Sequence, residues 1–408
     1  MVNKKILFIC ASVGLGHASR DITIAKELYK IIPDIEISWL AAPPASLALQ
    51  NAGETLLPEA SQYPNETIIM ENVSSTYQVN LFEYLTMVLQ QWAKSVDIFK
   101  EVINKYEFDL IIGDETYQIT NVVKTAIREN KPLMDIPLVA IYDFIGASTQ
   151  SDNLTEIGLI KMANEEYFLS DKTFDYGNLV HNFFVGEHKD IPDGALFGFP
   201  SENIRKLFDA LNFVSLGNII SFDPTKFMNR VTLRKDLGYG NYPLVICTIG
   251  GTGVGKALLE LCAESYPLIK KKMPNLQMIL VCGPNIPLVS INVPDGIVVK
   301  GYIPDLYKHF AASDLVITQC GGSTITELIA LKKNFLYFPL EKHFEQGLIA
   351  EHLKKNNIGV EMHFAQVTPQ VLAETIVNNI GKEIEYPQFD MNGAQKAAQL
   401  IQQFLILS

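Results

Sequence analysis

The residues best suited to bind a ligand or to catalyse a reaction lie in glycine-rich turns that follow short apolar runs. In the first turn, Gly14–Ser19 (GLGHAS), the chain leaves the run Ile6–Ala11 and enters a helical pattern over residues 19–31. Free N–H groups and the helix dipole at such a turn favour an anion, and Gly16 belongs to this turn. A positive helix end also lowers the pKa of a histidine, which favours the neutral imidazole of a general base. We therefore take His17 as a candidate base; a structural histidine is the alternative.

This first turn departs from the dinucleotide-binding fingerprint that it otherwise resembles. Ser19 replaces the third glycine, and Ala41 and Ala42 stand where an acidic residue would bind the ribose. NAD is therefore not expected, and the sequence predicts no cofactor.

A second glycine turn, Gly250–Ala257 (GGTGVGKA), nearly matches the phosphate-binding loop of P-loop nucleotidases. Ala257 occupies the place of the hydroxyl residue that would hold magnesium, which argues against that class. A glycine turn before a helix can still hold a diphosphate through backbone N–H groups. The candidate contacts are Gly250, Gly251 and Thr252.

The most specific segment runs from residue 301 to residue 352. A strand-like run ends in Gly321 and Gly322, and we expect Ser323 and Thr324 to cap the next helix and leave N–H donors for a phosphate. Glu327 follows about one turn later, where a carboxylate can accept both hydroxyls of a ribose.

Two further polar residues, Glu345 and Gln346, come after the next strand-like run, Phe335–Phe338. Ligands of α/β proteins bind at the carboxyl edge of the sheet, where these residues are expected. Taken singly, each of these side chains is more often a surface residue. Their order along the chain is what indicates a nucleotide site.

Alternating strand-like runs and helical patterns predict an α/β fold with parallel sheets. The pattern restarts after a charged, Gly/Pro-punctuated segment, which indicates two similar domains facing each other across a cleft. The expected divisions are a first domain at 1–220, a linker at 221–241, a second domain at 242–391, and a final helix at 392–408 that packs back on the first domain or caps the second.

The amino-acid composition argues against some classes of protein. The net charge is −12 and the pI is near 5.1, which argues against a nucleic-acid partner. The five cysteines form no C-x-x-C pair, which is typical of reduced thiols in a cytoplasmic protein. The sequence holds no run of about 18 apolar residues, so no transmembrane helix is expected.

The segment 301–352 resembles the donor site of GT-B glycosyltransferases. It is similar to the N-acetylglucosaminyltransferases that form lipid II and, more distantly, to the UDP-glucuronosyl- and glucosyltransferases. The resemblance implies two Rossmann-like domains and a nucleotide diphosphate-sugar donor, with UDP favoured. It also implies metal-independent, inverting transfer to a small-molecule or lipid acceptor, and it leaves peripheral membrane contact open. Gln319 departs from the histidine of many relatives, which puts one diphosphate contact in doubt.

The resemblance assigns roles residue by residue. By this likeness, the glycine turns at Gly250 and Gly321 bind the diphosphate of the donor. Glu327 binds its ribose, and Glu345 and Gln346 bind its sugar. The base of the nucleotide falls at Tyr302 and Ile303. His17 becomes the catalytic base, oriented by Asp114 at the end of the run Leu110–Gly113; a turn-capping aspartate is the alternative.

Two other functions stay open at this point. The run Gly14–Arg20 also resembles the nucleotide-sugar hydrolase of pseudaminic acid synthesis, in which water replaces the acceptor. The aromatic-rich stretch Val79–Asn104 favours a dedicated acceptor wall instead. A sugar-nucleotide-binding protein without catalysis is the third possibility, and it would bind ligand without turnover.

Overall fold

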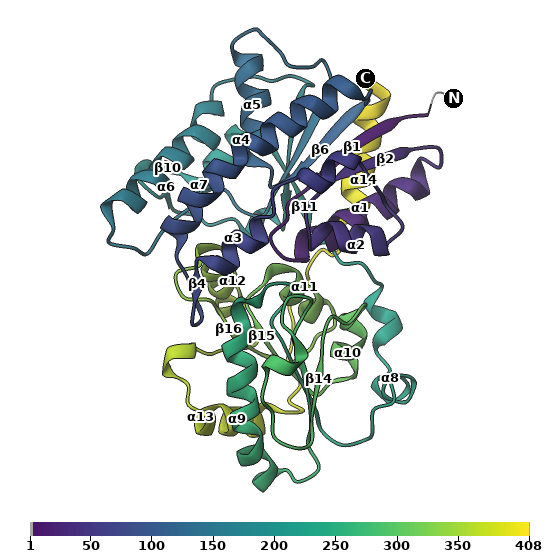
Figure 1. Cartoon of the computed structure of the whole chain (residues 1–408), viewed down its shortest axis with the longest axis vertical. Coiled ribbons are helices and arrows are strands. Elements are labelled where there is room, and N and C mark those ends of the chain that lie inside the picture. The colour runs from purple at the N-terminus through teal and green to yellow at the C-terminus, as the bar shows by residue number, and fades with distance from the viewer. Residues whose placement is uncertain (1–2, 408) are drawn as a thin grey trace. The chain divides into compact units, whose positions relative to one another are not determined.

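The computed structural model describes residues 3–407 and divides the chain into two compact units (Figure 1). Unit 1 comprises Met1–Met70, Leu81–Ser221 and Asp390–Ser408, and unit 2 comprises Glu71–Asn80 and Phe222–Phe389.

Two of the expected divisions differ from this arrangement. The segment 221–241, expected as a linker, holds the 3-10 helix η4 (Pro224–Phe227) and the helix α8 (Arg230–Asp236), and from residue 222 it belongs to unit 2. Residues 71–80, expected in the first domain, also belong to unit 2.

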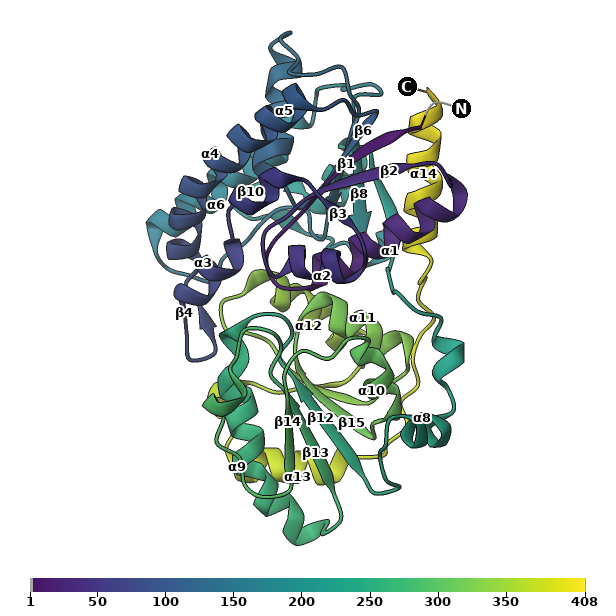
Figure 2. The same ribbon diagram turned by 45° about the vertical axis from the view of Figure 1, so that its right-hand side comes forward.

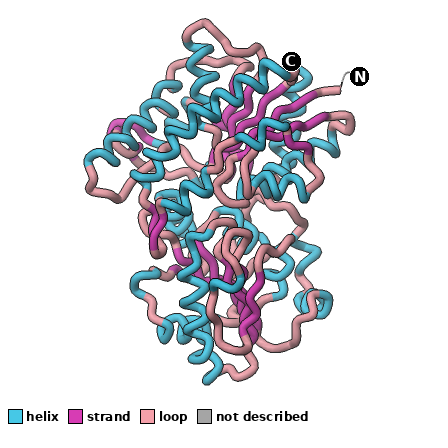
Figure 3. Tube along the Cα trace, in the orientation of Figure 1, coloured by secondary structure: helices cyan, strands magenta, loops and turns pink. Residues whose placement is uncertain are grey.

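Unit 1 is built on a parallel sheet of seven strands in the order β11-β8-β7-β6-β1-β2-β3. Figure 3 draws the strands of the chain in magenta and the helices in cyan. The strands are β1 (Lys5–Cys10), β2 (Glu36–Leu40), β3 (Thr55–Leu56), β6 (Leu110–Asp114), β7 (Leu138–Tyr142), β8 (Val180–Val185) and β11 (Phe213–Gly217). The helices are α1 (Gly16–Ile31), α2 (Ala45–Asn51), α3 (Glu66–Asn72), α4 (Leu81–Lys105), α5 (Tyr117–Arg128), α6 (Leu154–Tyr167), α7 (Ile204–Ala210) and α14 (Gly393–Leu407). The 3-10 helices η1 (Pro58–Gln62), η2 (Leu169–Asp171) and η3 (His188–Asp190) and the hairpin β9–β10 (Ala195–Leu196, Phe199–Asn203) complete it.

The continuous apolar run of β1 follows from burial on both faces of the sheet. Ile6, Phe8 and Cys10 face one core, which includes residues of α1 and α14. Leu7 and Ile9 face the other core, which includes residues of α4 and α5. A strand buried in this way needs apolar residues at every position, because successive side chains point to opposite faces.

Helix α14 packs beside α1 in unit 1, as Figure 2 shows at the C-terminal, yellow end of the chain. Its buried residues Ala397, Ala398 and Ile401 share a core with α1 and β1. The amide of Gln402 donates to the Ile31 carbonyl. The final helix therefore returns to the first domain, which is one of the two expected arrangements.

Unit 2 repeats the architecture with six parallel strands in the order β14-β13-β12-β15-β16-β17. They are β12 (Leu244–Thr248), β13 (Gln277–Val281), β14 (Ile297–Lys300), β15 (Leu315–Gln319), β16 (Phe335–Phe338) and β17 (Val360–Glu361). The remaining helices are α9 (Lys256–Lys272), α10 (Leu306–Ala312), α11 (Gly322–Ala330), α12 (Phe344–Lys355) and α13 (Pro369–Asn379). The unit also holds η5 (Gly253–Gly255), η6 (Leu288–Ser290), η7 (Phe364–Gln366) and the hairpin β4–β5 (Ser74–Ser75, Gln78–Val79). The prediction of two parallel α/β sheets is confirmed.

Among the described residues, none of the helices combines the length and the apolar character that crossing a bilayer requires.

The packing of α14 can be tested with a matched pair of substitutions. Ile401 is fully buried, whereas Ile406 on the same helix is 76% exposed. Ile401→Ala should lower the free energy of unfolding by about 2–5 kcal/mol, because it removes buried methylenes and leaves a cavity. Ile406→Ala should change it by less than about 0.5 kcal/mol. Urea unfolding followed by circular dichroism measures both; equal effects would show that α14 does not stabilise unit 1.

Candidate functional site

The topology of unit 1 creates a place for functional side chains between β1 and β6. From β1 the chain passes through α1 to β2 on one side, and from β6 it passes through α5 to β7 on the other. The loops after β1 and β6 therefore diverge at the carboxyl edge of the sheet, where α/β proteins bind ligands. Cys10 pairs with Asp114, so both strands end at the same level.

The structure brings together the two residues that were expected to form a dyad. His17 is the second residue of α1, which begins at Gly16 rather than at Ser19. Its Nδ1 lies 3.1 Å from Oδ2 of Asp114, the last residue of β6. The Asp114 side chain is fully buried, and the His17 side chain is 15% exposed.

A third residue, Arg20 of α1, contacts both members of this pair and also Asp143, the residue after β7. It lies three residues after His17 on α1, so both side chains share one face of the helix. Its Nε donates to Asp114 Oδ2 over 3.1 Å, and its other nitrogens contact Asp114 Oδ1 and Asp143 Oδ1. Its Nη2 also lies 2.9 Å from His17 Nδ1. Since a guanidinium can only donate, Nδ1 can donate to Asp114 or accept from Arg20, but not both.

These charges overturn the expectation that the helix end lowers the pKa of His17. Burial lowers this pKa, as does Arg20, whereas the charges of Asp114 and Glu115 and the hydrogen bond to Asp114 raise it. The net result is a pKa of about 10. The carboxylates outweigh the helix dipole, because they lie within contact distance in a buried place. At neutral pH the imidazole is therefore protonated, and Nδ1 donates to Asp114.

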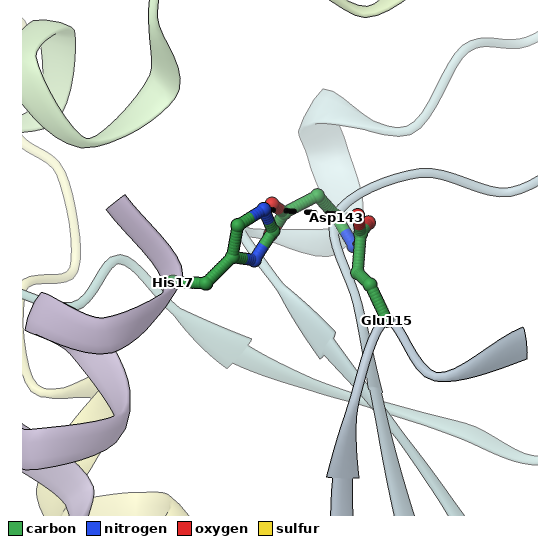
Figure 4. Close-up of side chains that lie close together, drawn as sticks. All are labelled: His17, Glu115 and Asp143. Atoms are coloured by element: carbon green, nitrogen blue, oxygen red, sulfur yellow. Dashed lines mark hydrogen bonds and ion pairs between the residues drawn. The ribbon is translucent and has the colours of Figure 1, made fainter. Parts of the chain in front are cut away.

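Glu115 faces the other nitrogen of the ring. Its backbone is left-handed, with φ of +47°, which is uncommon for a residue other than glycine. Its Oε1 accepts from the Asp143 N–H over 3.2 Å and from the Tyr117 hydroxyl over 3.3 Å, while Oε2 lies 3.9 Å from His17 Nε2. Figure 4 shows His17, Glu115 and Asp143 converging on one point.

The three converging side chains also satisfy the spacing of a metal site, since one ligand atom of each lies within 4.8 Å of the others. Asp143, however, is already paired with Arg20, whose guanidinium also lies beside the ring of His17. A permanent positive charge at this distance opposes a second cation.

Aromatic side chains of α4 line the neighbouring part of unit 1. The Trp92 indole donates to Glu66 Oε1 over 3.2 Å, and the Tyr84 hydroxyl donates to Glu66 Oε2 over 3.3 Å. Burial raises the pKa of Glu66, and the hydrogen bonds and the nearby His17 lower it in part. The expected long helix is present as α4, and its aromatic residues hold a carboxyl group near His17.

Four of these neighbours, or their roles, were not predicted from the sequence. Arg20 entered only as part of a likeness, and Glu66, Glu115 and Asp143 were not singled out. Glu115 and Asp143 carried a usable signal, because each follows directly after the last residue of a buried strand. Glu66 carried no such signal in the sequence, because its position near His17 depends on how α3 packs.

In unit 2 the two glycine turns follow neighbouring strands, β12 and β15. Thr248 pairs with Thr318, so both strands end at the same level. From β12 the chain proceeds to β13 on one side, and from β15 it proceeds to β16 on the other, which makes this the switch point of the second sheet. Gly250 is left-handed, with φ of +76°. Apart from Gly250 itself and its two neighbours in the chain, no atom of the described residues lies within 4 Å of the place where a Cβ on Gly250 would stand.

Gln319, the departure from the family pattern, connects these two turns. In the amide orientation that satisfies its neighbours, Nε2 donates to the Ile249 carbonyl over 2.8 Å, and Oε1 accepts from the Gly255 N–H over 3.3 Å. The side chain thus fixes the first turn from the end of β15.

The expected cap of α11 is wrong. The helix begins at Gly322, its N-cap residue is Gly321, and no side chain caps it. Ser323 and Thr324 lie inside the first turn. The first N–H groups of a helix have no partner within the helix, so they still point toward a position where an anion can bind.

The other candidate donor contacts in unit 2 form two groups. Glu327 lies on α11, and burial, followed by the charge of Asp305, raises its pKa to about 8. Tyr302 is half-exposed, and its pKa is raised by burial and by the charges of Asp305 and Glu327. These residues therefore lie close together, with the partly exposed Ile303 beside Tyr302 in the chain.

Glu345 and Gln346 begin α12 but differ in their surroundings. Glu345 is partly exposed, and its charge adds to burial in raising the pKa of Cys320. Gln346 is buried, and its Oε1 accepts from the Leu340 N–H over 2.8 Å. The Gln346 oxygen therefore fixes the turn after β16.

Comparison with known proteins places the chain in a family. Residues 245–404 match the glycosyltransferase family 28 C-terminal domain. An uncharacterized glycosyltransferase of Methanosarcina mazei is 30% identical over 391 residues, which are 94% of this chain and 92% of that protein. A second, from Methanopyrus kandleri, is 25% identical over 191 residues, which are 46% of this chain and only 53% of that protein.

A characterised activity appears in the name of a further relative. The UDP-N-acetylglucosamine–N-acetylmuramyl-(pentapeptide) pyrophosphoryl-undecaprenol N-acetylglucosamine transferase of Oceanobacillus iheyensis is 29% identical over 156 residues, 35% of this chain and 41% of that protein. Among solved structures, the glycotransferase of kitacinnamycin matches with a TM-score of 0.59 and 13% identity, over 99% of this chain and 100% of that one. This likeness supports the fold. The chain belongs to the GT-B glycosyltransferases that carry a family 28 C-terminal domain.

Proposed function

We propose that the protein transfers a sugar from a nucleotide diphosphate-sugar, with UDP favoured, to an acceptor hydroxyl, without a metal ion and with inversion at the anomeric carbon. The observation that supports this best is the pairing of two glycine turns at the switch point of the unit 2 sheet. Their N–H groups can hold a diphosphate, while Glu327 can accept the ribose hydroxyls. The acceptor is a small molecule or a lipid.

The donor contacts follow from the chemistry of each group. Backbone N–H groups of the turns that start at Gly250 and Gly321 would neutralise the diphosphate as it leaves. Glu327 binds hydroxyls as an acceptor, and this requires its ionised form. The base would lie against Tyr302, and the sugar against Glu345.

His17 is the best-placed proton acceptor in unit 1. With Nδ1 donating to Asp114, a neutral ring carries its lone pair on Nε2, the nitrogen that an attacking hydroxyl can use. The raised pKa makes this neutral form a minority at neutral pH, and it also makes the base strong. Arg20 and Asp114 hold the ring in this orientation, so they act as positioning residues.

The role of Glu327 predicts a pH-dependent affinity. Because its pKa is about 8, ionisation proceeds as the pH rises through 8. The affinity for UDP should therefore increase from about pH 6 to about pH 9 and then level off. Glu327→Gln keeps the size of the side chain, and it should weaken binding by about 1.5–3 kcal/mol at pH 9 and abolish the pH dependence. Calorimetric titration measures both; unchanged affinity in the variant would remove Glu327 from the site.

The role of His17 predicts a pH profile and a mutant effect. His17→Ala should lower turnover by about 10²- to 10⁴-fold and leave donor affinity nearly unchanged. In the wild type, kcat/KM should rise with pH toward about 10. Asp114→Asn should shift this rise to lower pH, because it removes the charge that stabilises the imidazolium, and its loss of turnover should be milder.

Two kinetic results would change the role assigned to His17 or the reaction assigned to the protein. If kcat/KM falls as the pH rises toward 10, His17 acts as a cation and another group takes the proton. If the wild type releases free sugar at the same rate with every acceptor and without any, the protein is a nucleotide-sugar hydrolase. The likeness of the run Gly14–Arg20 to a nucleotide-sugar hydrolase supports this second function, and Arg20, the last residue of that run, contacts both Asp114 and His17.

Metal independence gives a direct prediction. Arg20 supplies the positive charge beside His17 and Asp143, and the glycine turns supply the donors for the diphosphate. Activity should therefore survive about 5 mM EDTA with less than about a twofold change, because no step uses a cation. Loss of activity that magnesium or manganese restores would instead assign the cluster of His17, Glu115 and Asp143 to a metal.

A further inference from the structure

A short excursion of the chain, Glu71–Asn80, leaves unit 1 and folds as part of unit 2. We call this segment the strap. Its centre is the hairpin β4–β5, in which Ser74 pairs with Val79 and Ser75 pairs with Gln78. The excursion begins in the last turn of α3 and ends directly before α4.

Tyr77 anchors the strap in unit 2. Its side chain is 1% exposed, its hydroxyl donates to the Phe338 carbonyl over 2.8 Å, and its ring stacks on Phe364 with the centroids 4.4 Å apart. The backbone adds two bonds with Glu341, from the Glu341 N–H to the Tyr77 carbonyl and from the Val79 N–H to the Glu341 carbonyl. The strap is therefore fixed at the carboxyl end of β16.

The first residue of the strap, Glu71, reaches the glycine turn that follows β12. Its Oε1 accepts from the Gly253 N–H over 2.7 Å and from the Asn285 side-chain amide over 2.8 Å. The same amide also donates to the Gly251 carbonyl over 3.2 Å. Gly253 begins η5, which leads directly into α9, so the carboxylate lies at the positive end of that helix.

This contact has the chemistry of a bound phosphate oxygen. An anion accepts a charge-assisted hydrogen bond from a backbone N–H before a helix, in the turn that the proposed function assigns to the donor diphosphate. We propose that Glu71 is an internal stand-in for a donor phosphate: its carboxylate occupies the Gly253 N–H in the ligand-free protein, and the nucleoside diphosphate must displace it. This inference rests on the proposed function.

Contacts other than those of Glu71 also hold the turn. Gln319 holds Ile249 and Gly255 from the end of β15, and the backbone of Gly283 packs directly against the Gly250 carbonyl. The strap, in turn, is anchored by Tyr77. Glu71 is thus the one strap residue whose charge faces the turn from a segment that is already fixed elsewhere. Its consequence is a lower affinity for the diphosphate and faster release of the spent nucleotide.

The test compares wild type with Glu71→Gln, which keeps the size of the side chain and removes its charge. Titration calorimetry with UDP should show roughly three- to tenfold tighter binding by the variant, the scale of one weakened competing hydrogen bond to a charged group. Inorganic pyrophosphate should show a gain as well, whereas uridine, which lacks phosphate, should bind equally to both proteins. Glu374→Gln, an exposed change of the same charge on α13, should bind UDP like wild type.

The other possible binding results distinguish failure of the inference about Glu71 from failure of the proposed function. If wild type binds UDP and Glu71→Gln binds it equally or more weakly, Glu71 supports the turn and the inference is wrong, while the proposed function stands. If neither protein binds UDP, dTDP, GDP or pyrophosphate, the donor site itself is wrongly assigned and both fall. Glu71→Asp, which withdraws the carboxylate but keeps the charge, should also bind UDP more tightly and replaces Glu71→Gln if that variant does not fold.

Discussion

A buried ion pair between Arg20 and Asp114 determines the chemistry of unit 1. It joins α1 to the end of β6, and it holds the carboxylate that contacts His17. Burial raises the pKa of Asp114, but Arg20 and His17 outweigh this effect and hold it well below its usual range. Removing one partner of such a pair leaves an uncompensated buried charge, which typically costs about 3–5 kcal/mol. The position and the protonation of His17 therefore depend on two residues that need not touch a substrate.

The candidate sites of the two units differ in the groups that can stabilise negative charge. Unit 1 places the guanidinium of Arg20 and the imidazole of His17 among the carboxylates of Asp114, Glu115 and Asp143. Unit 2 has glycine turns with backbone N–H groups after β12 and β15, and Glu327 lies on α11, the helix that follows the second turn. The first arrangement suits the movement of a proton, and the second suits a diphosphate that carries away negative charge. The same sheet topology underlies both arrangements, because the loops of each candidate site follow the strands at which the strand order reverses.

Much of this could be predicted from sequence, because the signals were local. Apolar runs such as Ile6–Ala11 show burial on both faces, and the loops after such runs lie at the carboxyl edge of the sheet. The pairing of His17 with Asp114 came instead from the resemblance to glycosyltransferases, and the structure brings the two side chains together. The pKa of His17 could not be predicted, since it depends on how close the charges of Asp114, Arg20 and Glu115 lie to the ring in the fold. The strap could not be predicted either, because Tyr77 is one aromatic residue in a polar turn, and its buried place exists only in the folded unit 2. The wrong cap at Ser323 shows that a glycine can begin a helix where a hydroxyl residue was expected.

The protonation of His17 is the most direct test of this account. Nitrogen-15 NMR of the ring, titrated with pH and assigned by comparison with His17→Asn among the seven histidines, reports both the pKa and the tautomer. We expect a pKa of about 10 for His17 and, above that pH, a neutral ring that keeps its proton on Nδ1 toward Asp114. A pKa below the ordinary value of about 6.5, or a neutral ring protonated on Nε2, would contradict it, because Nδ1 would then accept from Arg20 and the lone pair would face away from the acceptor.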